Sequence, residues 1–172
     1  METKTETREY YRYDEIRSWP MVDGWSACPD DSHFRVSIHS EAQLRPSVLI
    51  GRGAEIERKA VVGAGARVGS EAVIGPWARV GAEAVIGAGA VVWFVVKVGA
   101  GVMVEYDAVI GSNAVIGPWA VIGSGARVGS DAVIGSGARV GAGARVGAGA
   151  TVDDEAVIES GEVVESGEVV EA

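Results

Sequence analysis

A six-residue repeat runs through most of this chain and constrains its fold more than any other feature. Every sixth residue from Ile38 to Val170 is aliphatic, without a break. The residue two places earlier is nearly always Ala or Val, and Gly commonly follows the aliphatic residue. An α-helix, with 3.6 residues per turn, cannot use a strict period of six. The repeat therefore predicts a solenoid in which identical units stack on one another.

Each repeat has the composition of a short strand followed by a corner. Side chains two residues apart on a strand point to the same side, so Ala72 and Ile74 are expected to face inward and Val73 outward. Gly75 then supplies the backbone freedom that a tight corner needs. Prolines stand two places after the aliphatic residue, where no ladder N–H is lost, at Pro46, Pro76 and Pro118.

The pattern aliphatic–Gly–x–x–small–x resembles that of the hexapeptide-repeat proteins, as in Val-Gly-Ser-Glu at 68–71 and Ile-Gly-Ser-Asn at 110–113. The resemblance covers residues 36–172. It implies an all-β fold, a left-handed parallel β-helix shaped as a triangular prism with three repeats per coil and seven to eight coils. It also implies a homotrimer. Because the family includes acyltransferases, γ-class carbonic anhydrases and inert scaffolds, the resemblance leaves the function open.

Residues 1–35 lie outside the repeat. They are rich in aromatic side chains: Tyr10, Tyr11, Tyr13, Trp19, Trp25 and Phe34. Since the open end of a solenoid exposes apolar surface and unpaired strand edges, we expect residues 10–35 to form an irregular cap over the first coil, with 1–9 as an arm. The alternative is a segment that docks other structural proteins. Residues 36–172 are predicted to form the β-helix, ending in an acidic tip at 151–172.

The charge distribution and apolar pattern exclude several classes of partner. The net charge is −9, but the tip holds eight of the 24 acids and none of the 15 bases, so the remaining chain is nearly neutral. Nucleic-acid binding would need a basic stripe, which is absent. No apolar stretch reaches the length of a membrane span, and Met1–Glu9 lacks the apolar core of a signal peptide. We therefore expect a soluble protein, cytoplasmic or virion-associated, that binds neither nucleic acid nor membrane.

Catalytic chemistry is not evident from the sequence. The family's acyltransferases use a coil-surface histidine as general base and a loop inserted between repeats, and its anhydrases bind zinc through three histidines. Here the two histidines, His33 and His39, precede the regular coils, and the repeat has no insertion. Cys28 could join them in a metal site, but the spacing fits no known ligand pattern. The sequence thus predicts no catalytic residue, no cofactor, no metal and no enzyme activity.

The outward positions predict an exposed apolar patch on one edge of the prism. At a period of 18 residues, one outward column and the corner after it bring together Val73, Trp77, Val91, Trp93, Phe94, Val95 and Val109. Large apolar patches on a surface mark contacts, so these residues are predicted to form the oligomer interface. A contact with a different partner and a groove for a small ligand are the alternatives.

The acidic tip is predicted to prevent end-to-end stacking. Glutamate replaces the corner Gly or the inward small residue at Glu159, Glu162, Glu165, Glu168 and Glu171. Inward charges on an edge strand oppose pairing with another molecule. The alternative is an acidic tail that frays.

Together these features predict a non-enzymatic structural or assembly protein, a rigid trimeric β-helix. A virion decoration or spike component and an engineered idealised scaffold both fit this description. The alternative is an acyltransferase or γ-carbonic-anhydrase relative, intact or decayed, whose site lies between subunits near His33 or His39.

Overall fold

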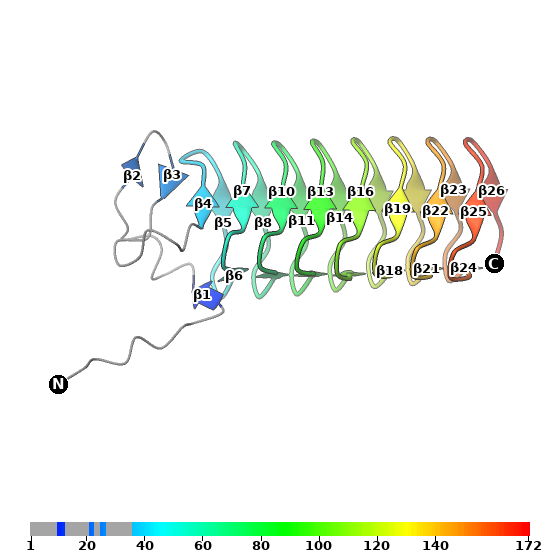
Figure 1. Ribbon diagram of the computed structural model, residues 1–172, viewed down its shortest axis with the longest axis horizontal. Helices are drawn as coiled ribbons and strands as arrows, with labels where there is room; N and C mark the ends of the chain where they lie inside the picture. Colours follow the sequence, from blue (N-terminus) through cyan, green and yellow to red (C-terminus); the bar gives the residue numbers. More distant parts are fainter. Residues whose placement is uncertain (1–9, 13–20, 23–24, 27–35) are drawn as a thin grey trace.

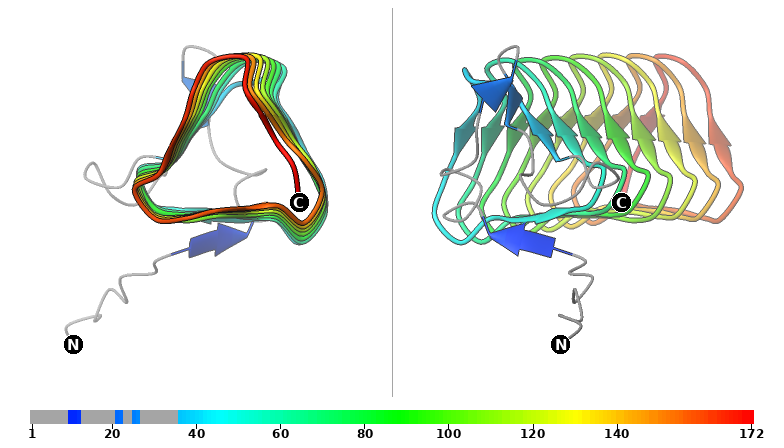
Figure 2. Two further views of the ribbon diagram at one scale, coloured as in Figure 1. Left: turned by 90° about the vertical axis from the view of Figure 1, so that its right-hand side faces the viewer. Right: turned by 60° about the vertical axis from the view of Figure 1, so that its left-hand side comes forward.

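Residues 36–172 form a left-handed parallel β-helix, a triangular prism whose coils stack in register (Figures 1 and 2). The structure, a computed structural model, describes residues 10–12, 21–22, 25–26 and 36–172. All regular elements in these ranges are strands, which confirms the all-β prediction. Each six-residue repeat contributes one short strand to one of three faces, numbered here in chain order.

Apart from β1, the strands of each face are parallel neighbours from successive coils. Face 1 consists of β4 (Ser37–Ile38), β7 (Glu55–Ile56), β10 (Val73–Ile74), β13 (Val91–Val92), β16 (Val109–Ile110), β19 (Arg127–Val128), β22 (Arg145–Val146) and β25 (Val163–Val164). Face 2 consists of β5 (Gln43–Leu44), β8 (Val61–Val62), β11 (Arg79–Val80), β14 (Lys97–Val98), β17 (Val115–Ile116), β20 (Val133–Ile134), β23 (Thr151–Val152) and β26 (Val169–Val170). Face 3 consists of β1 (Tyr10–Arg12), β6 (Leu49–Gly51), β9 (Arg67–Val68), β12 (Val85–Ile86), β15 (Met103–Val104), β18 (Val121–Ile122), β21 (Arg139–Val140) and β24 (Val157–Ile158).

The register along each face matches the predicted 18-residue coil. Val73 pairs with Glu55 on one side and with Val91 on the other. Strands β4 to β26 fill the three faces in strict rotation, which gives the seven to eight coils expected from the repeat.

The core is the column of side chains that the repeat points inward. Ala72, Ile74 and Ile110 are fully buried, whereas the outward Val73 is half-buried. Within the described residues every buried side chain is apolar. The prism is therefore held together by burial of aliphatic surface and by backbone ladders between coils.

Those ladders join neighbouring coils along the prism. The N–H of Val73 donates to the carbonyl of Ala90 at 3.0 Å, and the N–H of Gly75 donates to the carbonyl of Val92 at 2.7 Å. Neighbouring coils approach so closely at this corner that a Cβ on Gly75 would lie 2.8 Å from the backbone carbon of Trp93. The N–H groups at these two positions point toward the C-terminal end, so at the last coil the equivalent N–H groups are left without a following strand.

At the N-terminal end, one sheet edge is covered by the chain itself. Strand β1 pairs antiparallel with β6, with Tyr10 opposite Gly51 and Tyr11 opposite Ile50. Strands β2 (Met21–Val22) and β3 (Trp25–Ser26) form a separate antiparallel pair. The rest of the predicted cap and arm lies outside the described residues, so the cap over the first coil stays a prediction. No helix in the described part of the chain is long and apolar enough to cross a membrane.

The last coil is folded. Ile158 and Val164 are buried, which disfavours the frayed tail. Glu162 and Glu168 occupy the inward positions that the register predicted, but both side chains are exposed because no further coil covers them. Their carboxylates instead turn back and accept hydrogen bonds from the backbone N–H groups of two other residues in this coil. Glu162 accepts from Glu159 at 2.7 Å, and Glu168 accepts from Glu165 at the same distance. A role of this end in preventing stacking stays a prediction.

Candidate functional site

The edge between faces 1 and 2, termed the first edge, carries the side chains that depart most from the repeat. Its corners in the first four coils are residues 39–41, 57–59, 75–77 and 93–95. Farther along the same edge the corners return to Gly, Ser and Ala with single polar residues, as at 111–113 and 129–131. Side chains that depart from the repeat thus concentrate on the N-terminal half of one edge.

His39 belongs to this edge, and the expectation that it precedes the regular coils is wrong. Its backbone N–H donates to the carbonyl of Ile56 at 2.8 Å, in the same ladder as every later coil. Its carbonyl accepts from the N–H of Ala42 at 2.9 Å and closes the corner. His39 stands where several later coils have Gly, as at Gly75 and Gly111, so the sequence pattern did not show that the first corner begins here.

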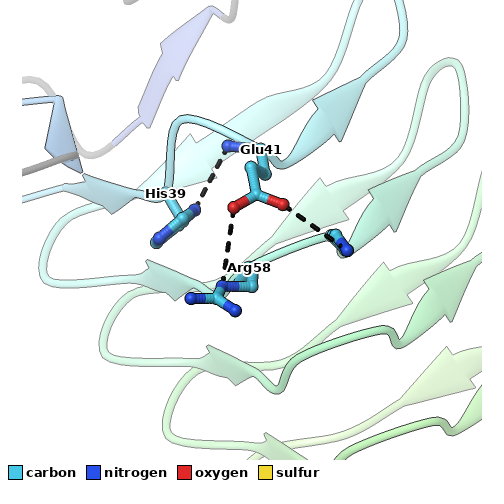
Figure 3. A network of polar contacts seen from close by, with 4 residues as sticks. His39, Glu41 and Arg58 are labelled. Carbon is cyan, nitrogen blue, oxygen red and sulfur yellow. Dashed lines mark hydrogen bonds and ion pairs between the residues drawn. The ribbon is translucent and has the colours of Figure 1, made fainter.

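A polar network links His39 to the next coil through Glu41 (Figure 3). The Nδ1 atom of His39 accepts a hydrogen bond from the backbone N–H of Glu41 at 3.2 Å, so the neutral imidazole carries its proton on Nε2. The carboxylate of Glu41 lies 3.6 Å from Nε of Arg58 and 3.7 Å from Nζ of Lys59. Both ion pairs join exposed side chains and contribute little to stability.

A groove of about 1080 Å³ runs beside this network on the face 2 side of the edge. It is lined by Ser40, Glu41, Ala42, Gln43, Lys59, Val61, Trp77, Arg79, Val95 and Lys97. Three cations and one carboxylate face it, so it is locally positive on a chain with a net charge of −9. The groove is open to solvent along its length.

Trp77 forms the apolar wall of the groove together with Val95. The Nζ atom of Lys59 lies 4.2 Å from the centroid of the indole ring, within range of a cation–π contact. Both wall residues have left-handed backbone, with φ of 62°. The same corner position has a left-handed backbone along the whole solenoid, for example at Lys59 and Asn113, so this conformation belongs to the fold, although it is costly for a β-branched residue such as Val95.

The structure brings the predicted patch residues together. Val73, Val91 and Val109 are adjacent and half-buried on face 1. Trp77, Trp93, Phe94 and Val95 lie on the first edge with 54%, 52%, 45% and 42% of their surfaces exposed. These seven residues are called the apolar patch below. Trp77 and Val95 belong to both the patch and the groove, so the two features share one boundary.

The basic side chains of the groove are the part of the site that sequence reasoning missed. Arg79 and Lys97 stand in successive outward positions of one 18-residue column, a signal that the sequence does contain. Two other predicted candidates, Cys28 and His33, lie outside the described residues. Within the described ranges, no three His, Cys, Asp or Glu side chains are placed to hold a metal ion.

The repeat also matches a known sequence family. Residues 95–124 and 120–154 match the family described as bacterial transferase hexapeptide (six repeats). The chain carries the hexapeptide repeat of this family. This confirms the resemblance on which the fold prediction rested. A search among curated protein sequences gave no match.

Solved structures with this hexapeptide-repeat fold are similar to the chain. One is a hexapeptide transferase family protein from Anaplasma phagocytophilum, with 19% identity and a TM-score of 0.56, covering 78% of this chain and 73% of that one. Another is a GDP-perosamine N-acetyltransferase from Caulobacter crescentus, solved with CoA and GDP-perosamine, with 24% identity and a TM-score of 0.46. The matched region covers 72% of this chain and only 52% of that enzyme. A third, a UDP-N-acetylglucosamine acyltransferase from Francisella novicida, has 16% identity, a TM-score of 0.48 and coverages of 77% and 62%.

The prediction of a non-enzymatic structural protein, whether virion component, spike or engineered scaffold, is wrong. The matching family is one of transferases, and the structure from Anaplasma phagocytophilum is described in the same terms. The prediction of no enzyme activity fails with it. Its physical basis was the absence of a coil histidine, but His39 lies on the first coil beside a groove.

Proposed function

We propose that this hexapeptide-repeat protein is an acyltransferase, which moves an acyl group from a thioester donor such as acetyl-coenzyme A to an amine or hydroxyl acceptor. The observation that carries the proposal is the positive groove on the first edge, with His39 at its border. Phosphate-bearing donors suit the cations Lys59, Arg79 and Lys97. The transferase family match and the shared fold support the same reading.

In this proposal His39 is the proton acceptor. A substrate N–H or O–H replaces the N–H of Glu41 at Nδ1, a contact of 3.2 Å that is long enough to exchange. As the proton moves to Nδ1, the acceptor nitrogen or oxygen attacks the thioester carbonyl carbon and the C–S bond breaks. The imidazolium then returns the proton to the departing thiolate, so the ring ends neutral.

Calorimetry with acetyl-coenzyme A is the binding test of this proposal. We expect one site per chain with a dissociation constant in the micromolar range, because the groove offers three cations and an indole. Absence of heat at millimolar ligand would contradict an acyl-thioester function.

We further propose that copies of the chain contact one another through the apolar patch, as the homotrimer that the family resemblance implies. The patch is exposed in the single chain, and buried aromatic side chains dominate the energetics of protein interfaces. Since the groove shares Trp77 and Val95 with the patch, the site then lies beside a subunit boundary.

Replacing Trp93 and Phe94 together with alanine is expected to weaken assembly more than folding. Both side chains are about half exposed in the single chain, so their loss leaves the inward core intact. Light scattering at micromolar concentration should show smaller species that retain the β-sheet circular dichroism of the parent. Replacement of Trp119, 69% exposed on the edge between faces 2 and 3, is the matched control. A double variant with the parental mass would show that the patch does not join subunits.

A further inference from the structure

A second exposed apolar surface crosses face 3, on the side of the prism opposite the first edge (Figure 2). At its centre the exposed Met103 on β15 lies between the half-buried Val85 and Val121 of the neighbouring strands. Tyr106 and Trp119, on the two corners that bound this face, are both exposed. These five residues are called the face 3 patch below. Association of copies through the apolar patch of the first edge would leave the face 3 patch open.

The indole of Trp119 lies against the coil that contains Met103. A Cβ on Gly101, two residues before Met103, would collide with the six-membered ring of that indole. The backbone N–H of Trp119 donates to the carbonyl of Ala100 at 3.0 Å, which ties its corner to the same coil. Five residues of extended chain separate Gly101 from Tyr106, a distance of about 16 Å. Indole, thioether and phenol therefore form a row across the whole width of the face.

Two arginines stand at the ends of the face 3 patch along the prism axis. Arg67 is the register partner of Val85, and Arg139 is the register partner of Val121. The two arginines are four strand spacings of about 4.8 Å apart, or about 19 Å in all. Both side chains are exposed, and within the described residues no ion pair involves either of them. The face thus presents an apolar centre between two unpaired positive charges.

These charges argue against a second copy of this chain as the occupant of face 3. A two-fold contact between parallel copies would set Arg67 against the partner's Arg67. A two-fold contact between antiparallel copies, centred on Met103, would set Arg67 against the partner's Arg139. Like charges that face each other across an interface oppose binding. The occupant that fits is therefore acidic where this face is basic.

We infer that face 3 binds a segment of another protein that has an apolar centre and carboxylates about 19 Å apart. Aromatic side chains concentrate the binding energy of protein interfaces, and methionine adapts its shape to a partner. Each arginine can form a bidentate ion pair with a carboxylate. Acids of the partner are expected at the two ends of the patch rather than beside Tyr106, where Glu105 and Asp107 would repel them. Because the face 3 patch is separate from the groove, binding there does not depend on the proposed acyl transfer.

Selection of peptides by the immobilised full chain tests this site. The probe is a random phage-displayed library of peptides of about 16 residues, long enough to span about 19 Å even as a helix. We expect enriched peptides to carry aliphatic or aromatic residues in the middle and Asp or Glu on both sides. A synthetic copy of the most enriched peptide should bind more weakly at high salt, because exposed ion pairs are screened. Absence of enrichment over the bare support, or enriched peptides without acids, would overturn the inference.

Charge reversal assigns the selected peptide to face 3. R67E/R139E should weaken its binding at least tenfold in fluorescence polarisation. R127E/R145E makes the same charge change at two exposed register partners on face 1 and is the matched control, which should stay within twofold of the parent. All four side chains are exposed, so both variants should melt within a few degrees of the parent. Equal weakening by the two variants would overturn the inference.

Removing the aromatic row distinguishes a protein segment from an acidic polysaccharide. W119A/Y106A keeps both arginines and should weaken the selected peptide at least tenfold. Polygalacturonate, which has carboxylates but no apolar side chains, should not displace the peptide from the parent at matched ionic strength. Displacement would assign the face to an acidic polysaccharide, and parental affinity in W119A/Y106A would show that the apolar row does not bind. Either result would overturn the inference.

Discussion

Replacing Ile110 with aspartate is expected to unfold or aggregate the protein. Ile110 is fully buried, and its neighbours in the described core are apolar, so a carboxylate there would have no partner. Burying an unpaired charge costs several kcal/mol, against a typical total stability of about 5–15 kcal/mol. A thermal melt followed by circular dichroism should show loss of the cooperative transition.

The same substitution at an outward position is the control for this result. Val133 on β20 is 41% exposed, so V133D places its carboxylate in water and should melt within a few degrees of the parent. A parental melt for I110D as well would mean that the inward register is wrong.

Removing the acids of the last coil is expected to convert the protein into fibres or very large species. The five changes are E162A and E168A at the inward positions, and E159G, E165G and E171G at the corners. Glu162 and Glu168 now accept the hydrogen bonds of backbone donors at this end. Once they are gone, donors of the last coil can pair with strand carbonyls at the N-terminal edge of another molecule. Such a head-to-tail contact does not close on itself and continues as a fibre.

A second variant tests whether charge alone prevents stacking or whether the carboxylates of Glu162 and Glu168 are needed. D153N with E155Q removes two charges from the same end but leaves Glu162 and Glu168 in place. It should remain monodisperse in sedimentation at high concentration, whereas the five-site variant should sediment as large species. A monodisperse five-site variant would show that these acids do not protect the end.

The fold was predictable because one rule is repeated in every unit. Ile74, Gly75 and Pro76 each identify the same register, and an error of one residue would turn every aliphatic side chain outward. Handedness and coil number followed from the family resemblance rather than from the spacing itself.

The site was less predictable because it depends on departures from the repeat. The stacking of Trp77, Trp93 and Val95 on one edge could be read from the 18-residue period. The groove could not be read from that period, because it lies where corner side chains of the first edge border outward side chains of face 2. His39 was misplaced because a histidine at a corner normally held by Gly conceals the start of the first coil.

Acyl transfer at the first edge is tested most directly by a rate measurement. The measured quantity is the initial rate of coenzyme A release from acetyl-coenzyme A in the presence of mixed amine and hydroxyl acceptors. The parent should release coenzyme A well above the uncatalysed rate, and H39A should lose at least about a hundredfold, the usual contribution of a positioned base. W119A, altered on a different edge, should keep the parental rate. Release at the parental rate by H39A, or none above background by the parent, would contradict the account.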